Sequence, residues 1–267
     1  MRLLSSRRRH PAAKALLLIA ALFVIGAVYA AVAPTEQSAA EPNTSQQVQK
    51  GKELFSANCS SCHGLNGEGS SQGPTLVGVG AAAVDFQVST GRMPLAMPGQ
   101  QAPVKPGEFT NDEIAALAAY VATMGPGPAI PDSSQYSTDG LTAEEIARGG
   151  ELFRTNCSAC HNFTGQGGAL PEGRHAPSLV GVPNKHIYEA MLTGPQQMPV
   201  FSDQVLPSQN KREIIAYLNA IHAQPNHGGL DLGGLGPVTE GMAGWAIGIG
   251  CLIGFAVWIT ARGARAR

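Results

Sequence analysis

The stretch Cys59-Ser60-Ser61-Cys62-His63 decides the architecture of this 267-residue chain, because it recurs as Cys157-Ser158-Ala159-Cys160-His161. C-x-x-C-H is the attachment signature of a c-type haem. A disulfide within each pair, or one zinc site built from both pairs, is the alternative. Neither requires a histidine directly after the second cysteine in both copies. The sequence therefore predicts two covalently bound haem c groups, with Cys59, Cys62, Cys157 and Cys160 as attachment residues and His63 and His161 as axial iron ligands.

The repeat extends well beyond this motif. The matching blocks indicate an internal duplication. The gaps between the blocks differ in length, so the two copies have diverged in their loops. The matching blocks are residues 51–59 and 149–157 before the motif and, after it, residues 74–79 and 177–182, 90–91 and 193–194, and 117–121 and 214–218.

Each copy is expected to begin with a helix that ends at the motif and to close with a short helix that carries a tyrosine. On the first helix, Gly51 and Phe55 lie four positions apart and so share one face. The glycine allows another helix to approach closely, and Tyr120 is the expected partner. An ordinary amphipathic helix is the alternative for such a pair taken alone. Gly149, Phe153 and Tyr217 repeat the arrangement in the second copy.

Both ends of the chain carry apolar runs. Residues 15–33 follow a basic start, and they form either a retained membrane anchor, which we favour, or a cleaved signal. Residues 242–260 form a second run that is followed by three arginines. Because the basic residues lie outside both runs, the termini are expected in the cytoplasm and the repeat outside it. A net charge of −1 gives no indication of a nucleic-acid partner.

The two copies resemble class I cytochrome c domains in the Gly/Phe first helix, C-x-x-C-H, a Pro-x-Leu loop, Met-Pro and the closing tyrosine helix. The whole chain beyond residue 48 resembles the dihaem cytochrome c subunit of actinobacterial cytochrome bcc complexes, which are menaquinol–cytochrome c reductases. The phrases that carry this resemblance are residues 89–94, 160–165, 191–196 and 233–237.

The resemblance implies an all-α chain of two tandem class I cytochrome c domains with N- and C-terminal transmembrane helices. The linker between the domains is expected to be extended. The expected segments are an anchor or signal (1–34), a tether (35–47), cytochrome c domain 1 (48–124), the linker (125–141), cytochrome c domain 2 (142–223), a Gly-rich connector (224–241), a transmembrane helix (242–260) and a cytoplasmic basic tail (261–267).

The resemblance also implies a role and partners. Such a subunit takes electrons from the Rieske iron–sulfur subunit of a complex that also contains cytochrome b. It passes them to an aa3-type cytochrome c oxidase within a respiratory supercomplex at the cell membrane. It belongs to a translocase but has no substrate-turnover site of its own. The alternatives are a cytochrome c subunit of a periplasmic-type dehydrogenase, a catalytic dihaem enzyme, and a structural metal-binding anchor protein.

A methionine thioether is the expected sixth iron ligand in an electron-transfer cytochrome. In the second copy Met198, which precedes a proline, is the candidate. The first copy offers Met93 and Met97, each followed by proline, and alignment of the copies places Met198 opposite Leu95, midway between them. The residues leave this choice open, and the phrase shared with the family favours Met93. The spare histidines are expected in loops or at the surface, with His175 as the strongest alternative ligand among them.

Overall fold

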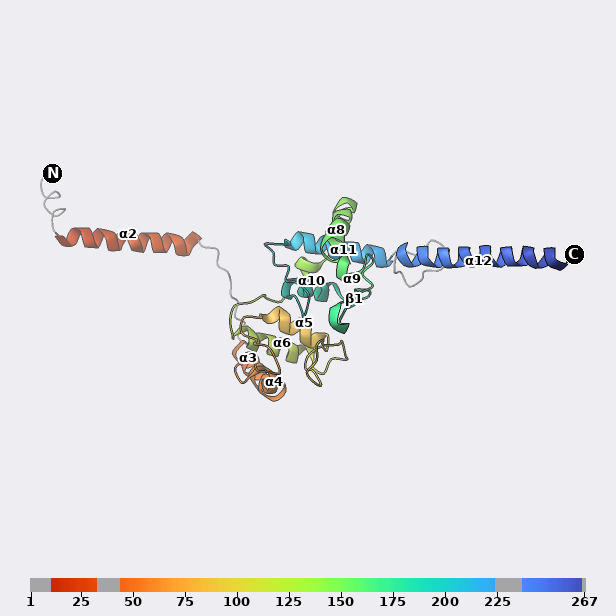
Figure 1. Cartoon of the computed structure of the whole chain (residues 1–267). Coiled ribbons are helices and arrows are strands. Elements are labelled where there is room, and N and C mark those ends of the chain that lie inside the picture. The colour runs from red at the N-terminus through yellow and green to blue at the C-terminus, as the bar shows by residue number, and fades with distance from the viewer. Residues whose placement is uncertain (1–10, 33–43, 224–236, 266–267) are drawn as a thin grey trace. The chain divides into compact units, whose positions relative to one another are not determined.

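The computed structural model describes residues 11–32, 44–223 and 237–265, and it divides the chain into two units, residues 1–44 and 45–267. The described part is mostly helical, as the sequence predicts (Figure 1). Most of the predicted tether and connector lies outside the described residues. The first unit contains α2 (Pro11–Val32). The second contains α3 (Thr44–Asn58), α4 (Ser60–His63), α5 (Ala81–Ser89), α6 (Asn111–Ala122), α7 (Ser133–Tyr136), α8 (Ala143–Asn156), α9 (Ser158–His161), β1 (Gly168–Ala169), η1 (Pro171–Gly173), β2 (His175–Ala176), α10 (Asn184–Thr193), α11 (Ser208–Ala223) and α12 (Pro237–Arg265).

In the first domain, α3 crosses α6 at a glycine. A Cβ atom added at Gly51 would lie 2.0 Å from the carbonyl oxygen of Ala116, so no larger residue fits at this crossing. One turn further along α3, the ring of Phe55 packs on Tyr120 with 5.3 Å between ring centroids. The predicted face of the first helix and its tyrosine partner are confirmed.

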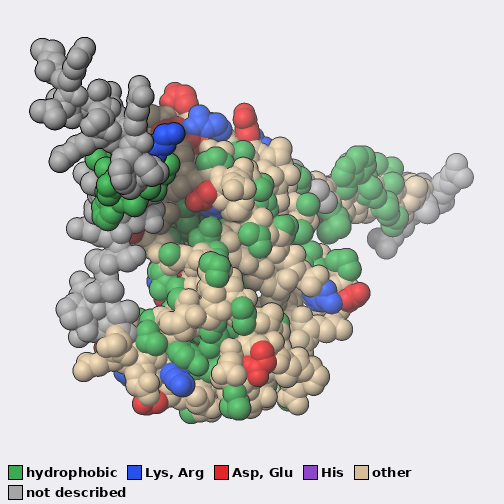
Figure 2. All heavy atoms as spheres, turned by 90° about the vertical axis from the view of Figure 1, so that its left-hand side faces the viewer, with side chains coloured by type: hydrophobic (Ala, Val, Ile, Leu, Met, Phe, Trp, Pro, Cys, Tyr) green, Lys and Arg blue, Asp and Glu red, His purple; other side chains and the backbone are tan. Residues whose placement is uncertain are grey.

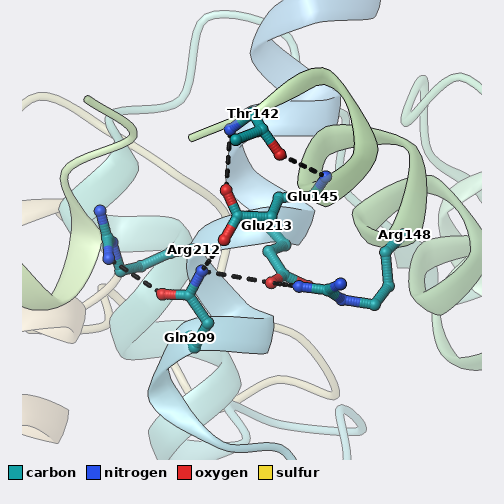
Figure 3. A network of polar contacts seen from close by, with 6 residues as sticks. All are labelled: Thr142, Glu145, Arg148, Gln209, Arg212 and Glu213. Atoms are coloured by element: carbon teal, nitrogen blue, oxygen red, sulfur yellow. Dashed lines mark hydrogen bonds and ion pairs between the residues drawn. The ribbon is translucent and has the colours of Figure 1, made fainter. Parts of the chain in front are cut away.

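The second domain repeats this crossing between α8 and α11. A Cβ atom at Gly149 would lie 2.0 Å from the carbonyl oxygen of Glu213, and Phe153 packs on Tyr217 at 5.7 Å. The same helix pair carries a polar network that the repeat did not predict (Figure 3). The side chain of Glu213 is fully buried and pairs with Arg148 of α8, while Gln209 donates to both Glu145 and Glu213 at 3.1 and 3.2 Å. These contacts hold the helix that precedes the second haem motif against the last helix.

The segment between the domains is extended, as expected, until it forms the single helical turn α7, which the sequence did not predict. Its first half lies along domain 1, where Ala82 N donates to Pro128 O at 3.1 Å. Its second half lies against domain 2, where Arg212 Nε donates to Ser137 O at 2.7 Å. The linker is therefore attached to both domains rather than free between them.

Within α12, residues 239–263 are long and apolar enough to cross a membrane, with a mean hydropathy of 2.0, and no other helix of the described residues meets this criterion. This helix extends beyond the predicted span 242–260 at both ends. Within α2, residues 14–26 form an apolar helix, and the ends of the predicted anchor lie outside the residues whose side chains are described. The N-terminal transmembrane helix therefore stays a prediction.

The two domains of the repeat meet where α5 packs against α10. Lys185 Nζ lies 2.6 Å from Asp85 Oδ2, and Ser89 Oγ lies 3.1 Å from His186 Nε2. Glu189, which is 0% exposed, lies beside them with both carboxylate oxygens unbonded and Lys185 Nζ 3.7 Å away.

Asp85, His186 and Glu189 bring three potential metal-ligand atoms within 4.8 Å of one another, but the charges at the junction favour a proton. With Lys185 protonated and both carboxylates ionised, the cluster would carry one excess negative charge. A single proton removes that excess, whereas a divalent cation would reverse it. Burial and the neighbouring Asp85 raise the pKa of Glu189 to about 9, while Lys185 opposes the shift. Burial also lowers the pKa of His186, which favours its neutral ring, while Asp85 opposes this shift.

The proton on Glu189 makes the stability of the junction depend on pH. Between the ordinary glutamate pKa of 4.5 and the folded value of about 9, the unfolded chain binds fewer protons than the folded chain. The free energy of unfolding therefore falls as pH rises, by up to about 1.4 kcal/mol per pH unit. Glu189→Gln removes this loss, so its Tm should match that of the wild type near pH 5 and exceed it increasingly toward pH 8 in thermal scans. Glu151→Gln, at an exposed position on α8, is the control. A Tm difference that does not change with pH would show that folded Glu189 is ionised.

Candidate haem sites

The two C-x-x-C-H motifs have the same backbone structure. Each first cysteine stands between two helices, with φ −120° and ψ −33° at Cys59 and φ −121° and ψ −34° at Cys157. The histidine amide then donates to the carbonyl oxygen of that cysteine, at 3.0 Å in the first copy and 2.9 Å in the second. The long first helix, crossed by the last helix at a glycine, places this turn in both domains.

The histidine of each motif is oriented by a proline carbonyl group. His63 Nδ1 lies 2.8 Å from Pro74 O, and His161 Nδ1 lies 3.0 Å from Pro177 O. A carbonyl oxygen can only accept, so Nδ1 carries the ring proton and donates it. The other nitrogen, Nε2, is then left with a free lone pair, which is the form that binds iron. The duplicated Pro-x-Leu loops therefore prepare both rings as metal ligands.

The structure does not bring the cysteines of the two motifs together as one zinc site. Among the described residues, the group of potential metal ligands whose atoms lie within 4.8 Å of one another stands at the domain junction and contains no cysteine. Within the motifs, burial and the second cysteine nearby raise the pKa of the first thiol, Cys59 or Cys157, to about 11. The two pairs therefore do not form a single four-thiol site.

In the second domain, the residues expected around one haem line a single cavity of about 500 Å³. Arg174 also lines this cavity, and its Nε atom is buried without a hydrogen-bond partner. Such an atom costs free energy unless a ligand oxygen meets it. A haem, with an apolar ring and two carboxylates, fits this combination of thiols, imidazole, thioether and buried cation. The expected residues in the cavity wall are Cys157, Cys160, His161 and Met198.

The methionines of the first domain differ in their surroundings. Met93 packs against the same hydrophobic core cluster as Cys59, which also contains Phe55. Met97 is 74% exposed. A sixth ligand must lie beside the core that holds the haem, so this difference favours Met93. In the second domain, Met191 is a buried core residue that also contributes to the cavity wall.

The spare histidines have other contacts. The His175 side chain is exposed, and its residue belongs to β2. His186 stands at the domain junction, and His222 Nε2 lies 2.8 Å from Thr164 O. His227 lies outside the described residues. Sequence reasoning missed the junction residues Asp85 and Glu189, because their relation depends on a contact between the two copies.

Family comparisons identify both halves of the repeat. Residues 48–125 match the family described as cytochrome c, and residues 144–218 match the family described as cytochrome C oxidase, cbb3-type, subunit III. Two cytochrome c domains imply covalently bound haem c.

Relatives cover almost the whole chain. A protein of Mycobacterium tuberculosis (strain ATCC 25618 / H37Rv) is 47% identical over 96% of this chain and 93% of its own length. A protein of Corynebacterium diphtheriae is 43% identical over 95% of each. Both are named cytochrome bc1 complex cytochrome c subunit. The chain therefore belongs to the family of cytochrome c subunits of cytochrome bc1 complexes.

Proposed function

We propose that this protein is a membrane-anchored dihaem cytochrome c that relays electrons within a respiratory complex. The observation that carries the proposal is the pair of complete C-x-x-C-H turns with matching backbone geometry. Each is followed by a histidine whose Nδ1 is held by a proline carbonyl group. Each bound haem iron supplies a one-electron couple.

The proposed attachment residues are Cys59, Cys62, Cys157 and Cys160. The proposed axial ligands are His63 with Met93 in domain 1 and His161 with Met198 in domain 2. Thioether ligation favours the reduced iron and raises the potential. Two protein ligands on each iron also leave no coordination position for a substrate. The protein is thus a transfer subunit of a quinol–cytochrome c reductase, without a turnover site of its own.

The proposed electron donor is the Rieske iron–sulfur subunit, which lies beside cytochrome b in a menaquinol-oxidising complex. The proposed acceptor is an aa3-type cytochrome c oxidase in the same supercomplex. Family membership supports the first assignment, and the resemblance in the sequence supports the second. On the face that Figure 2 shows, charged side chains are few and do not gather into a patch of one sign. That surface suits a relay tethered near its partners better than a diffusing carrier steered by charge.

The proposed topology is two transmembrane helices with the haem domains on the extracytoplasmic side. The apolar α12 and the basic residues outside both apolar runs support it. A cytochrome subunit of a periplasmic-type dehydrogenase is the alternative. Purification in mild detergent, with mass spectrometry of the partners and a quinol-driven reduction assay, separates the two. Co-purification with a dehydrogenase, and without cytochrome b, would overturn the proposal.

Haem attachment can be tested one domain at a time. The double change Cys157→Ser with Cys160→Ser removes both thioether positions of domain 2 and leaves the motif of domain 1 complete. We expect the pyridine haemochrome content to fall from two haems per chain to one. Cys251→Ser, in α12, is the control and should keep both. Two covalent haems in the double variant would contradict the assignment.

Axial ligation can be tested through carbon monoxide binding and redox potential. Met198→Ala should open the iron of domain 2 to carbon monoxide in the reduced protein and lower its potential, because a thioether stabilises the reduced iron. Met93→Ala should do the same in domain 1, and the exposed Met97→Ala should do neither. An effect of Met97→Ala without an effect of Met93→Ala would reverse the assignment in that domain.

A further inference from the structure

The first copy is six residues longer than the second between its Thr-Gly pair and the start of its last helix. The longer loop of domain 1 includes residues 101–105, which we call the strap. The strap does not stay on its own domain: it contacts residues of domain 2 and lines the cavity of that domain.

Gln101 attaches the strap to the small sheet of domain 2. Its Nε2 donates to the carbonyl oxygen of His175 at 2.6 Å, and its Oε1 accepts from the His175 amide at 3.1 Å. A side-chain amide offers the same donor and acceptor as a peptide group. It therefore pairs with β2 at His175 as a neighbouring strand would.

A second hydrogen bond from domain 2 holds Ala102, the next residue of the strap. Gln196 Nε2, two residues before Met198, donates to the carbonyl oxygen of Ala102 at 3.2 Å. Ala102 is buried, at 8% exposure. The strap is thus bonded both to the loop that follows the haem motif of domain 2 and to the loop that carries its candidate methionine ligand.

The cavity of domain 2 is lined from both domains. Domain 1 contributes Phe86, Arg92 and the strap to the lining of the cavity that His161 and Met198 also line. We propose that domain 1 forms one wall of the haem pocket of domain 2, with Gln101 as the residue that positions this wall. The proposal rests on the proposed function, because it requires a haem at His161.

The charges on this wall fit the anionic edge of a haem. Arg92 and Lys105 from domain 1 line the cavity together with Arg174 of domain 2. Lys105 is paired with Glu108 and Arg174 with Glu172, while Arg174 Nε is buried and unbonded. The Arg92 guanidinium lies 4.7 Å from the ring centroid of Phe86, and burial lowers the pKa of Arg92. Cations placed in a partly buried cavity favour a ligand with carboxylates, and the haem propionates supply them.

The strap also limits the access of water to the pocket. Water around a haem stabilises the more highly charged oxidised iron, so a closed pocket raises the reduction potential. When the other domain closes the pocket, the reduction potential of the haem in it depends on how the two domains are joined. Domain 1 thus tunes the electron affinity of the second haem without providing a ligand to it.

The test compares Gln101→Ala with Gln100→Ala in the full chain, in detergent. Gln101 makes the two bonds to His175, whereas its neighbour Gln100 is exposed. In Gln101→Ala, hydrogen exchange at the His175 amide should quicken roughly tenfold, because two hydrogen bonds are lost. The potential of one haem should fall while that of the other stays unchanged, and Gln100→Ala should behave as the wild type.

The outcomes separate this proposal from the proposed function. If Gln101→Ala keeps both haems and shows wild-type exchange and potentials, the strap is not a wall of the pocket and the inference is wrong. If both potentials shift equally, Gln101 acts on the whole fold and the inference is also wrong. If the wild-type chain lacks a haem in domain 2, by haemochrome analysis of the separated domain peptides, the proposed function itself fails.

Discussion

The close crossing of the first and last helices is the contact on which both haem domains depend. At Gly51 and Gly149 a single added carbon atom would come within 2.0 Å of a carbonyl oxygen of the partner helix. Protein interiors are close-packed, so a shift at this crossing moves everything attached to it. The C-x-x-C-H turn follows the crossing helix directly in both domains. Its position against the Pro-x-Leu loop, and so the orientation of the histidine ring, follows from how closely these two helices approach.

Around this shared crossing the two copies have diverged, both within domain 2 and where the copies touch each other. Domain 2 supports its helix pair with an ion pair between the buried Glu213 and the half-exposed Arg148. Among the described residues, the corresponding helices of domain 1 show no matching ion pair. Breaking such a pair leaves an uncompensated buried charge, which makes it costly to alter once present. At the junction, Asp85 of one copy meets Lys185 and Glu189 of the other. The duplication therefore kept the haem turn and changed the surfaces that join the copies.

This difference explains what the sequence could predict. The haem turns, the glycine crossings and the tyrosine partners depend on contacts within one copy, and each appears twice, so the repeat itself exposes them. Gln101, Asp85 and Glu189 depend on contacts between copies, some separated by more than seventy positions in the chain. Such residues have no counterpart in the other copy, and their types carry no motif. A glutamine in a proline-rich loop is an ordinary surface residue until the partner backbone is placed beside it.

The same contacts change how the domain boundary is understood. By composition, the Gly- and Pro-rich linker predicts only an extended connection between the two domains. In the structure, the linker is hydrogen-bonded to domain 1 at Pro128 and to domain 2 at Ser137. The strap, which belongs to domain 1, is hydrogen-bonded to domain 2 at a separate place. The linker and the strap join the domains at separate places, and two such attachments restrict rotation of one domain against the other more strongly than one attachment does. The proposed relay would need its two redox centres at a constant separation, because each would serve as donor or acceptor to the other in every cycle. The contacts of the strap and of the linker join the two domains, so in this proposal the joined pair, rather than either domain alone, is the electron-transferring unit.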